Sequence, residues 1–168
     1  MDKLTYYKDR YDESHAWYKG VEDKASKSMS LTSIVISSLI ILIKLEDVFS
    51  PENGVEAISS FVLLFAAISL FYSIFLSLSV FKIADTGTMP TSEDQVLPCF
   101  YASEECKQTE ITDAYIHAVI INREVVKTKI EYLDLSQRFF KYGLMLLGLY
   151  LAIYSLSNLY ISLSVLVS

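Results

Sequence analysis

Three long stretches without a charged residue dominate the chain, and polar segments separate them. The first covers residues 28–43 and is extended past Lys44 by Leu45, the second covers residues 57–81, and the third covers residues 142–168. A helix needs about 20 apolar residues to cross the roughly 30 Å hydrocarbon core of a bilayer. Lys44 can reach the interface with its ammonium group and so lengthen the first stretch. The pattern predicts transmembrane helices at residues 28–45, 57–81 and 142–166.

The segment before the first apolar stretch has a helical pattern. Residues 2–27 contain no proline and one glycine, Gly20. Less polar positions recur at spacings of four and three from Leu4 to Ala25, which is typical of a heptad seam. We therefore expect residues 1–27 to form an amphipathic helix that continues into the first span, giving one helix from about residue 3 to residue 45.

The two remaining connections differ in character. Residues 46–56 contain the helix breakers Pro51 and Gly54 and predict a short loop, and residues 82–103 contain Gly87, Pro90 and Pro98 and predict a longer one. Acidic residues at 104 and 105 favour a new helix start. Residues 104–141 then predict a second amphipathic helix, without proline or glycine after residue 107, that runs into the third span.

The distribution of basic residues predicts the topology. Six precede the first span, one lies between the first two spans, and seven lie between the second and third. The positive-inside rule then puts the N-terminus and residues 82–141 in the cytoplasm, and the loop 46–56 and the C-terminus outside. The expected fold is an all-α membrane protein with three transmembrane helices. Its two amphipathic helices, 1–27 and 104–141, pack together as a cytoplasmic helical stalk.

Composition narrows the functional classes. The net charge of −6 argues against stable nucleic-acid binding, because phosphate contacts require a basic surface. Residues 1–27 lack the short apolar core of a cleavable signal peptide, so we expect the first span to be retained. Two cysteines, Cys99 and Cys106, cannot form a disulfide framework, and we expect them in a reducing compartment.

Polar residues within the spans form stripes on single helix faces. They are Ser69, Ser73 and Ser77 in the second span, and Ser155, Asn158 and Ser162 in the third. Small hydroxyl residues allow helices to pack closely and to form hydrogen bonds with one another. The alternative is that one stripe lines a water-filled path in an oligomer. We expect these six residues to face a pore or a subunit contact, and Asn158 is the most informative because its amide needs a partner.

Motifs for catalysis and metal binding are weak. The spacing of Arg10 and His15 is that of HEPN ribonucleases, but two residues five positions apart face different sides of a helix. Three residues could share a divalent metal on one helical face: Glu110, Asp113 and His117. The simpler interpretation of both sets is that these residues lie on a solvated helix surface. We expect no enzymatic activity, no cofactor and no metal.

The second amphipathic helix carries two further features. Asn122 lies among apolar neighbours, where an asparagine can fix the register of a helix pair or can instead face water. Four cations descend the same helix towards the third span: Arg123, Lys127, Arg138 and Lys141. They are candidates for contact with anionic lipid headgroups or with an anionic signal molecule. We expect Tyr11, Trp17 and Tyr18 to pack against residues 108–141.

Two segments resemble small bacterial membrane effectors of the SLATT type. Residues 11–27, with Tyr11, Trp17 and Lys24, are similar to the segment that leads into the first span of those proteins. Residues 122–138, with Asn122, Lys127 and Arg138, are similar to their closing segment. The family core has two adjacent spans, whereas this chain has a longer external loop and a third span.

The resemblance implies a function in bacterial antiphage defence. Such proteins lie beside nucleotide-signalling and reverse-transcriptase defence systems, and the resemblance implies an inner-membrane effector that forms homo-oligomers and permeabilises the membrane in abortive infection. Its expected partners are membrane lipid, further copies of itself, and an upstream defence sensor or anionic nucleotide signal. The loop 84–103 is the expected place of action for such a trigger. The alternative is a non-conducting membrane anchor that recruits a soluble partner through residues 104–141.

Overall fold

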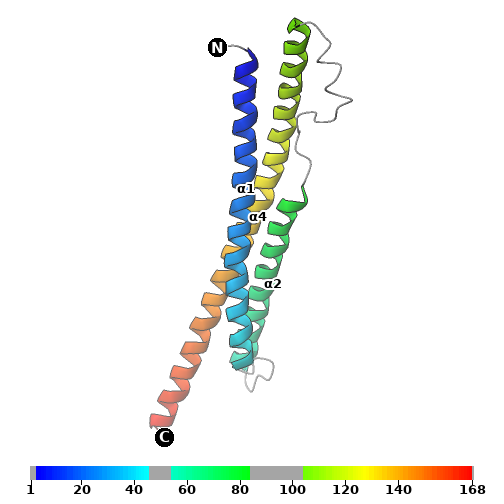
Figure 1. Ribbon diagram of the computed structural model, residues 1–168. Coiled ribbons are helices and arrows are strands. Elements are labelled where there is room, and N and C mark those ends of the chain that lie inside the picture. Colours follow the sequence, from blue (N-terminus) through cyan, green and yellow to red (C-terminus); the bar gives the residue numbers. More distant parts are fainter. Residues whose placement is uncertain (1–2, 46–53, 84–103, 168) are drawn as a thin grey trace. The chain divides into compact units, whose positions relative to one another are not determined.

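All regular structure in the described part of the chain is helical. The structure, a computed structural model, describes residues 3–45, 54–83 and 104–167, and for residues 45, 104–106 and 160–167 it describes the backbone alone. Its helices are α1 (Lys3–Leu45), α2 (Gly54–Lys82) and α4 (Glu104–Val167), shown in Figure 1. This confirms the prediction of an all-α chain. Most of the predicted loops 46–56 and 82–103, with Cys99, lies outside the described residues.

The helix limits agree closely with the sequence pattern. Helix α1 continues without interruption from the polar N-terminal segment into the first apolar stretch, and α4 runs for 64 residues through the junction near residue 141. Neither helix contains proline, and Gly143 does not break α4. Each of the three helices contains a segment long and apolar enough to cross a membrane.

The chain divides into two packing units. The first unit comprises residues 1–25 and 80–132, and the second comprises residues 26–79 and 133–168. Helices α1 and α4 contribute to both units. The part of each helix in the first unit is rich in charged residues, and most of the part in the second unit is apolar.

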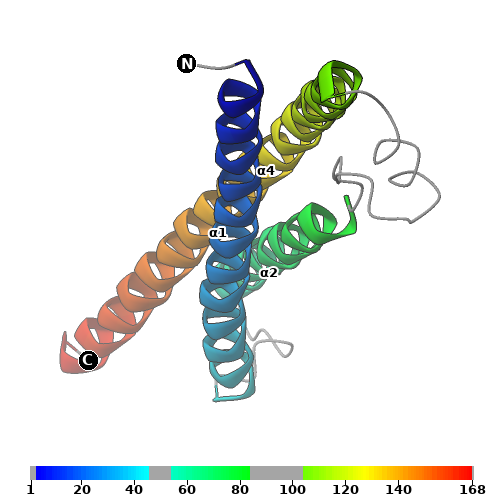
Figure 2. The same cartoon turned by 45° about the horizontal axis from the view of Figure 1, so that its top comes forward.

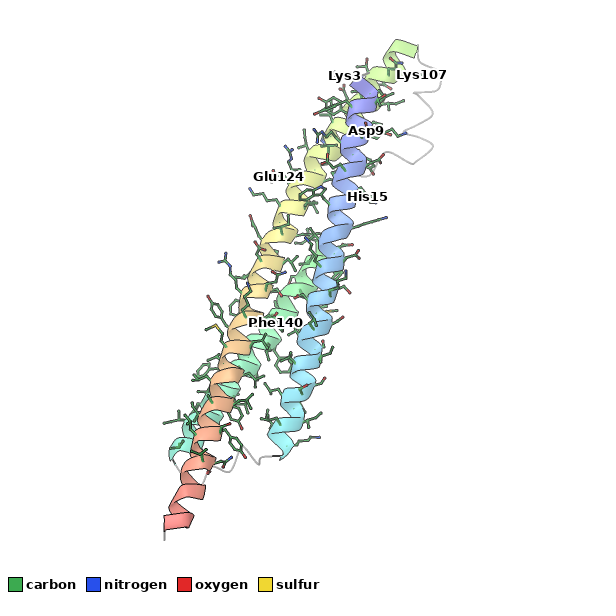
Figure 3. All side chains as sticks on the ribbon, turned by 90° about the vertical axis from the view of Figure 1, so that its left-hand side faces the viewer. Lys3, Asp9, His15, Lys107, Glu124 and Phe140 are labelled. Carbon is green, nitrogen blue, oxygen red and sulfur yellow. The ribbon has the colours of Figure 1, made fainter. Side chains whose placement is uncertain are left out.

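In the first unit, α1 and α4 lie side by side and run in the same direction (Figure 2). The rings of Tyr11 and Tyr115 are in edge contact with centroids 5.6 Å apart, and further along both helices Glu22 contacts Lys129. Figure 3 shows His15 on α1 and Glu124 on the neighbouring α4. The expected packing of Tyr11 on residues 108–141 is therefore observed.

In the second unit, all three helices contribute to one apolar core. Its buried members are Ile36, Leu39, Leu63, Leu70 and Tyr150. Large apolar side chains also cover the outside of this unit, and Phe61 is 64% exposed. A water-soluble bundle rarely exposes so much contiguous apolar surface, whereas a bilayer solvates it.

The buried positions of α4 follow a seven-residue repeat. One position of each repeat is buried without being aliphatic. Along α4 it is occupied by Asn122, Lys129, Ser136, Gly143 and Tyr150. The apolar residues Val126 and Leu133 fill intervening buried positions. A seven-residue repeat keeps one stripe of a helix against its neighbours over a long distance. Three of these residues, Lys129, Ser136 and Gly143, join α4 to α1 or α2.

Candidate functional site

A cluster of three serines joins α2 to α4 in the second unit. The hydroxyl of Ser136 lies 2.8 Å from the hydroxyl of Ser77 and 3.1 Å from that of Ser73, and it is 2.9 Å from the carbonyl oxygen of Ser73. Ser73 in turn donates to the carbonyl oxygen of Ser136 at 2.9 Å. All three side chains are fully buried. Two of the six polar residues selected from the sequence thus form hydrogen bonds within the chain.

Close helix packing continues beside the serine cluster at Gly143. A β-carbon added at Gly143 would lie 2.7 Å from Cγ of Leu70 and 3.4 Å from the carbonyl oxygen of Ala66. Because α2 passes directly over this glycine, a larger residue at position 143 would push the helices apart. The serine cluster and Gly143 together define the α2–α4 contact.

The other selected residues of the spans lie differently. Ser69 is partly buried, whereas Ser155 and Asn158 are exposed on α4. The side chain of Ser162 lies outside the described residues. Ser73 and Ser77 are therefore enclosed within the chain, whereas Ser155 and Asn158 are accessible from outside it.

The hydroxyls of the first span are satisfied by their own helix. Ser33 and Ser37 donate to the carbonyl oxygens of Met29 and Ser33 at 2.9 Å, and Thr32 donates to that of Ser28 at 2.8 Å. This i to i−4 bonding is the usual way in which hydroxyl groups are accommodated in apolar helices. It leaves these side chains with no need for a partner on another helix.

A fully buried lysine joins α1 to α4 in the first unit. Lys129 is fully buried, and its Nζ lies 2.6 Å from Oε1 of Glu22 and 3.7 Å from the centroid of the Tyr18 ring. Partial burial of Glu22 alone would raise the pKa of its carboxyl group. The hydrogen bonds from Lys129 and Tyr18, with the charge of Lys129, outweigh burial and lower the pKa of Glu22 below its ordinary value.

Asn122 lies one heptad before this lysine and is also fully buried. Its Nδ2 donates a long hydrogen bond of 3.5 Å to the hydroxyl of Ser14, and its Oδ1 has no partner among the described residues. The alternative that Asn122 faces water is therefore wrong. An amide in this position matches the expected location of a register-setting residue.

A cavity of about 500 Å³ lies between α1 and α4 in the first unit. Trp17 lines it from α1, and Arg123 and Lys127 line it from α4. Neither cation forms an ion pair within the part of the chain that the structure describes. Two of the four cations selected from the sequence are thus gathered at one cavity. The other two, Arg138 and Lys141, are exposed on α4 in the second unit.

The residues considered for catalysis are engaged by their own helix. Arg10 Nε donates to the hydroxyl of Tyr6 at 3.3 Å and Arg10 Nη1 contacts Glu13 at 2.7 Å, and both hydrogen bonds raise the pKa of its guanidinium group. His15 stacks between the rings of Tyr11 and Tyr18. Nothing brings Arg10 and His15 together as a catalytic pair.

The acidic residues and the histidine considered for metal binding do not converge. Glu110, Asp113 and His117 are all exposed on α4. Within residues 3–45, 54–83 and 104–167, no group of three or more histidine, cysteine, aspartate or glutamate side chains could hold a metal ion.

Three residues that sequence reasoning did not select belong to these contacts. They are Glu22, Lys129 and Ser136. The available signal was the seven-residue spacing of Asn122, Lys129 and Ser136, which becomes visible only when polar residues are allowed on a buried stripe.

Comparisons with known proteins found no matching family model, no matching curated protein and no matching solved structure.

Proposed function

We propose that this chain is a bacterial inner-membrane effector of antiphage immunity, which assembles from several copies and permeabilises the membrane when triggered. Three helices of sufficient length and apolar character, with large apolar residues outside the second unit, support membrane insertion. The resemblance of residues 11–27 and 122–138 to SLATT-type effectors supports the role in defence. In this proposal, residues 1–27 and 82–141 are cytoplasmic and the C-terminus is external.

The observation that carries the proposal is the exposed amide of Asn158 in the apolar C-terminal part of α4. No hydrogen-bonding partner of this amide is found among the side chains that the structure describes. An unpaired amide in an apolar environment costs roughly 2–7 kcal/mol, depending on the reference state. A second copy of α4, or water in a path between copies, removes this cost.

The geometry also selects which polar residues take part. Ser155 lies three positions before Asn158 and is exposed on the same side of the helix. Ser73 and Ser77 are left out, because their hydroxyls are bonded to Ser136 within the chain. The proposed subunit contact or pore lining is therefore the α4 stripe that contains Ser155 and Asn158.

Membrane potential and dye entry test the proposal in bacteria that express the chain at rising levels. High expression drives assembly by mass action even without a trigger. We expect depolarisation that rises steeply with expression, is kept by Asn158→Gln and is lost in Asn158→Leu. Depolarisation by Asn158→Leu at the same protein level as wild type would rule out the role of this amide.

Ser37→Leu is the matched control. Ser37 is an exposed polar residue of the first span, and its hydroxyl is bonded to the carbonyl oxygen of Ser33. Replacing it by leucine removes a polar group without removing a contact to another helix, so Ser37→Leu should depolarise as wild type does. Loss of activity in both variants would indicate an effect of span composition rather than of Asn158.

A membrane anchor that recruits a soluble partner is the second candidate. The observation that favours it is Ile120, which is 58% exposed on α4 within the first unit, together with the internally satisfied hydroxyls of the first span. Membrane insertion without depolarisation at any expression level would favour the anchor. Ile120→Lys should then abolish binding of the soluble partner.

A further inference from the structure

Trp17 occupies an unusual position for the largest apolar side chain of the first unit. It is the single tryptophan of the protein, it is 60% exposed, and it lies at the edge of the cavity between α1 and α4. Tryptophan is highly buried on average in folded proteins. Its exposure next to an open cavity indicates a surface that is completed by another molecule.

The geometry points to a second copy of this chain as that molecule, with Trp17 of each copy inserted into the cavity of the other. This pairing rests on the proposed membrane insertion, because insertion orients all copies in the same direction.

The walls of the cavity suit an aromatic ring. Val119, Val126 and Ile130 form its apolar part on α4, and the cavity measures about 500 Å³. An indole ring placed there would bury its own apolar surface and that of the aliphatic walls. The exposed Trp17 side chain and the apolar cavity are thus complementary, and each copy presents both.

The charges around the cavity are compatible with a second copy of the chain, because both signs are present. The edge carries the cations Arg10, Arg123 and Lys127 and also the carboxylates Glu13 and Glu131. Arg10 is already paired with Glu13, so Glu131 is left beside Arg123 and Lys127 and offsets part of their charge. A surface with both signs of charge is complementary to itself, as a two-fold contact requires.

The level of Trp17 along the helices also fits a two-fold contact. Tyr11 lies beside Tyr115 and Glu22 lies beside Lys129, so Trp17, midway between them, is level with the cavity walls around residue 122. Rotation about a two-fold axis parallel to the helices leaves every residue at its own level. Trp17 of one copy therefore meets the cavity of the other without an axial shift.

Disulfide cross-linking between two differently tagged copies tests the pairing in membranes. Both copies carry Cys99→Ser and Cys106→Ser, one copy adds Trp17→Cys and the other adds Val119→Cys. The control replaces Trp17→Cys by Lys19→Cys, which is exposed and lies about 200° around α1. We expect a yield of mixed dimer several-fold above the control. Equal yields would overturn the pairing.

The emission of Trp17 provides a second test without any substitution. Wild-type protein is reconstituted in lipid nanodiscs that hold either one copy or two. Because Trp17 is the only tryptophan, its emission should shift to shorter wavelength in two-copy discs, where the ring leaves water. Identical spectra at both occupancies would overturn the pairing.

The pairing and the proposed function fail in different ways. Mixed dimers in a membrane that never depolarises would support the pairing of two copies and contradict the proposed pore. Depolarisation that depends on Asn158, without cross-linking between positions 17 and 119, would support the proposed pore and contradict the pairing.

Discussion

The ammonium nitrogen of Lys129 lies 2.6 Å from the carboxylate of Glu22, although the two residues are 107 positions apart in the sequence. The lysine side chain is fully buried, whereas the glutamate side chain is 27% exposed. A buried ammonium group is stable only when a carboxylate and further contacts compensate its lost hydration. The face of the Tyr18 ring, 3.7 Å away, supplies the second contact. This pair joins α1 to α4 in the first unit.

Because Lys129 is buried and Glu22 is partly exposed, we expect mutation of Glu22 to cost more stability than mutation of Lys129. Glu22→Ala leaves the buried ammonium group of Lys129 without a countercharge, and we expect it to destabilise the first unit by about 3–5 kcal/mol. Lys129→Met should cost less, because methionine fills the same space and Glu22 can turn towards water. Thermal unfolding followed by helical circular dichroism measures both. Equal losses in the two variants would contradict the asymmetry.

Glu13→Ala is the matched control for that experiment. Glu13 also pairs with a cation, Arg10, at 2.7 Å, but both side chains are about half exposed. Exposed ion pairs contribute little to stability because water screens them. The unfolding midpoint of Glu13→Ala should therefore match that of wild type.

The lowered pKa of Glu22 predicts a pH dependence of stability. A carboxyl group whose pKa is lower in the folded than in the unfolded protein stabilises the fold fully above its ordinary pKa. That stabilisation is lost as the pH falls through the lowered pKa. We expect acid to destabilise wild type in this range more than Glu22→Gln, and unfolding midpoints across the acid range measure the difference. Parallel pH curves for the two proteins would contradict the role of Glu22, and Glu13→Gln should behave as wild type.

Much of the helical structure could be predicted from local sequence features. Long runs without proline predicted the continuous helices α1 and α4, whereas the predicted loop 46–56 was too long, because α2 begins at Gly54. These features act within a few residues of the chain, so a single sequence is sufficient to find them. The orientation of the helices in a membrane stays a prediction.

The internal contacts were harder to predict because their partners are distant in the sequence. Lysine is almost never fully buried without a partner, so the sequence alone predicts that Lys129 is exposed like the other basic residues between the second and third apolar stretches. Its burial depends on Glu22, and nothing near position 129 reveals that partner. The serines at 73 and 77 were recognised as one helix face, but their partner, Ser136, lies in a segment that alternates charged and apolar residues.

Gly143 provides a test of the α2–α4 contact. The β-carbon of Gly143→Ala would lie 2.7 Å from Cγ and 2.8 Å from Cδ2 of Leu70, so the helices or Leu70 must move. We expect a loss of about 1–3 kcal/mol, as for other overpacked cores.

Gly148→Ala is the control, since no atom lies within 4 Å of its added β-carbon. That variant should be neutral or slightly stabilised through its helix propensity. Unfolding in detergent compares the two, and equal stability would contradict the close contact at Gly143.

Asn122 tests whether a buried polar residue in the first unit serves stability or specificity. Its Oδ1 has no partner among the described residues, and a buried unsatisfied group costs about 1–3 kcal/mol. Asn122→Leu should therefore raise stability by a similar amount while it relaxes the register of the helices, since a buried asparagine restricts helix pairs to one alignment.

Thr112→Val is the control, because the Thr112 hydroxyl is bonded to the carbonyl oxygen of Gln108 at 2.6 Å in its own helix. Thermal unfolding measures the stability, and disulfide cross-linking within one chain, between cysteines placed at successive positions of α1 and α4, measures the register. A stable Asn122→Leu protein with additional cross-linked positions would support a role in specificity, whereas a large loss of stability would mean that Asn122 is bonded more strongly than its contact with Ser14 indicates.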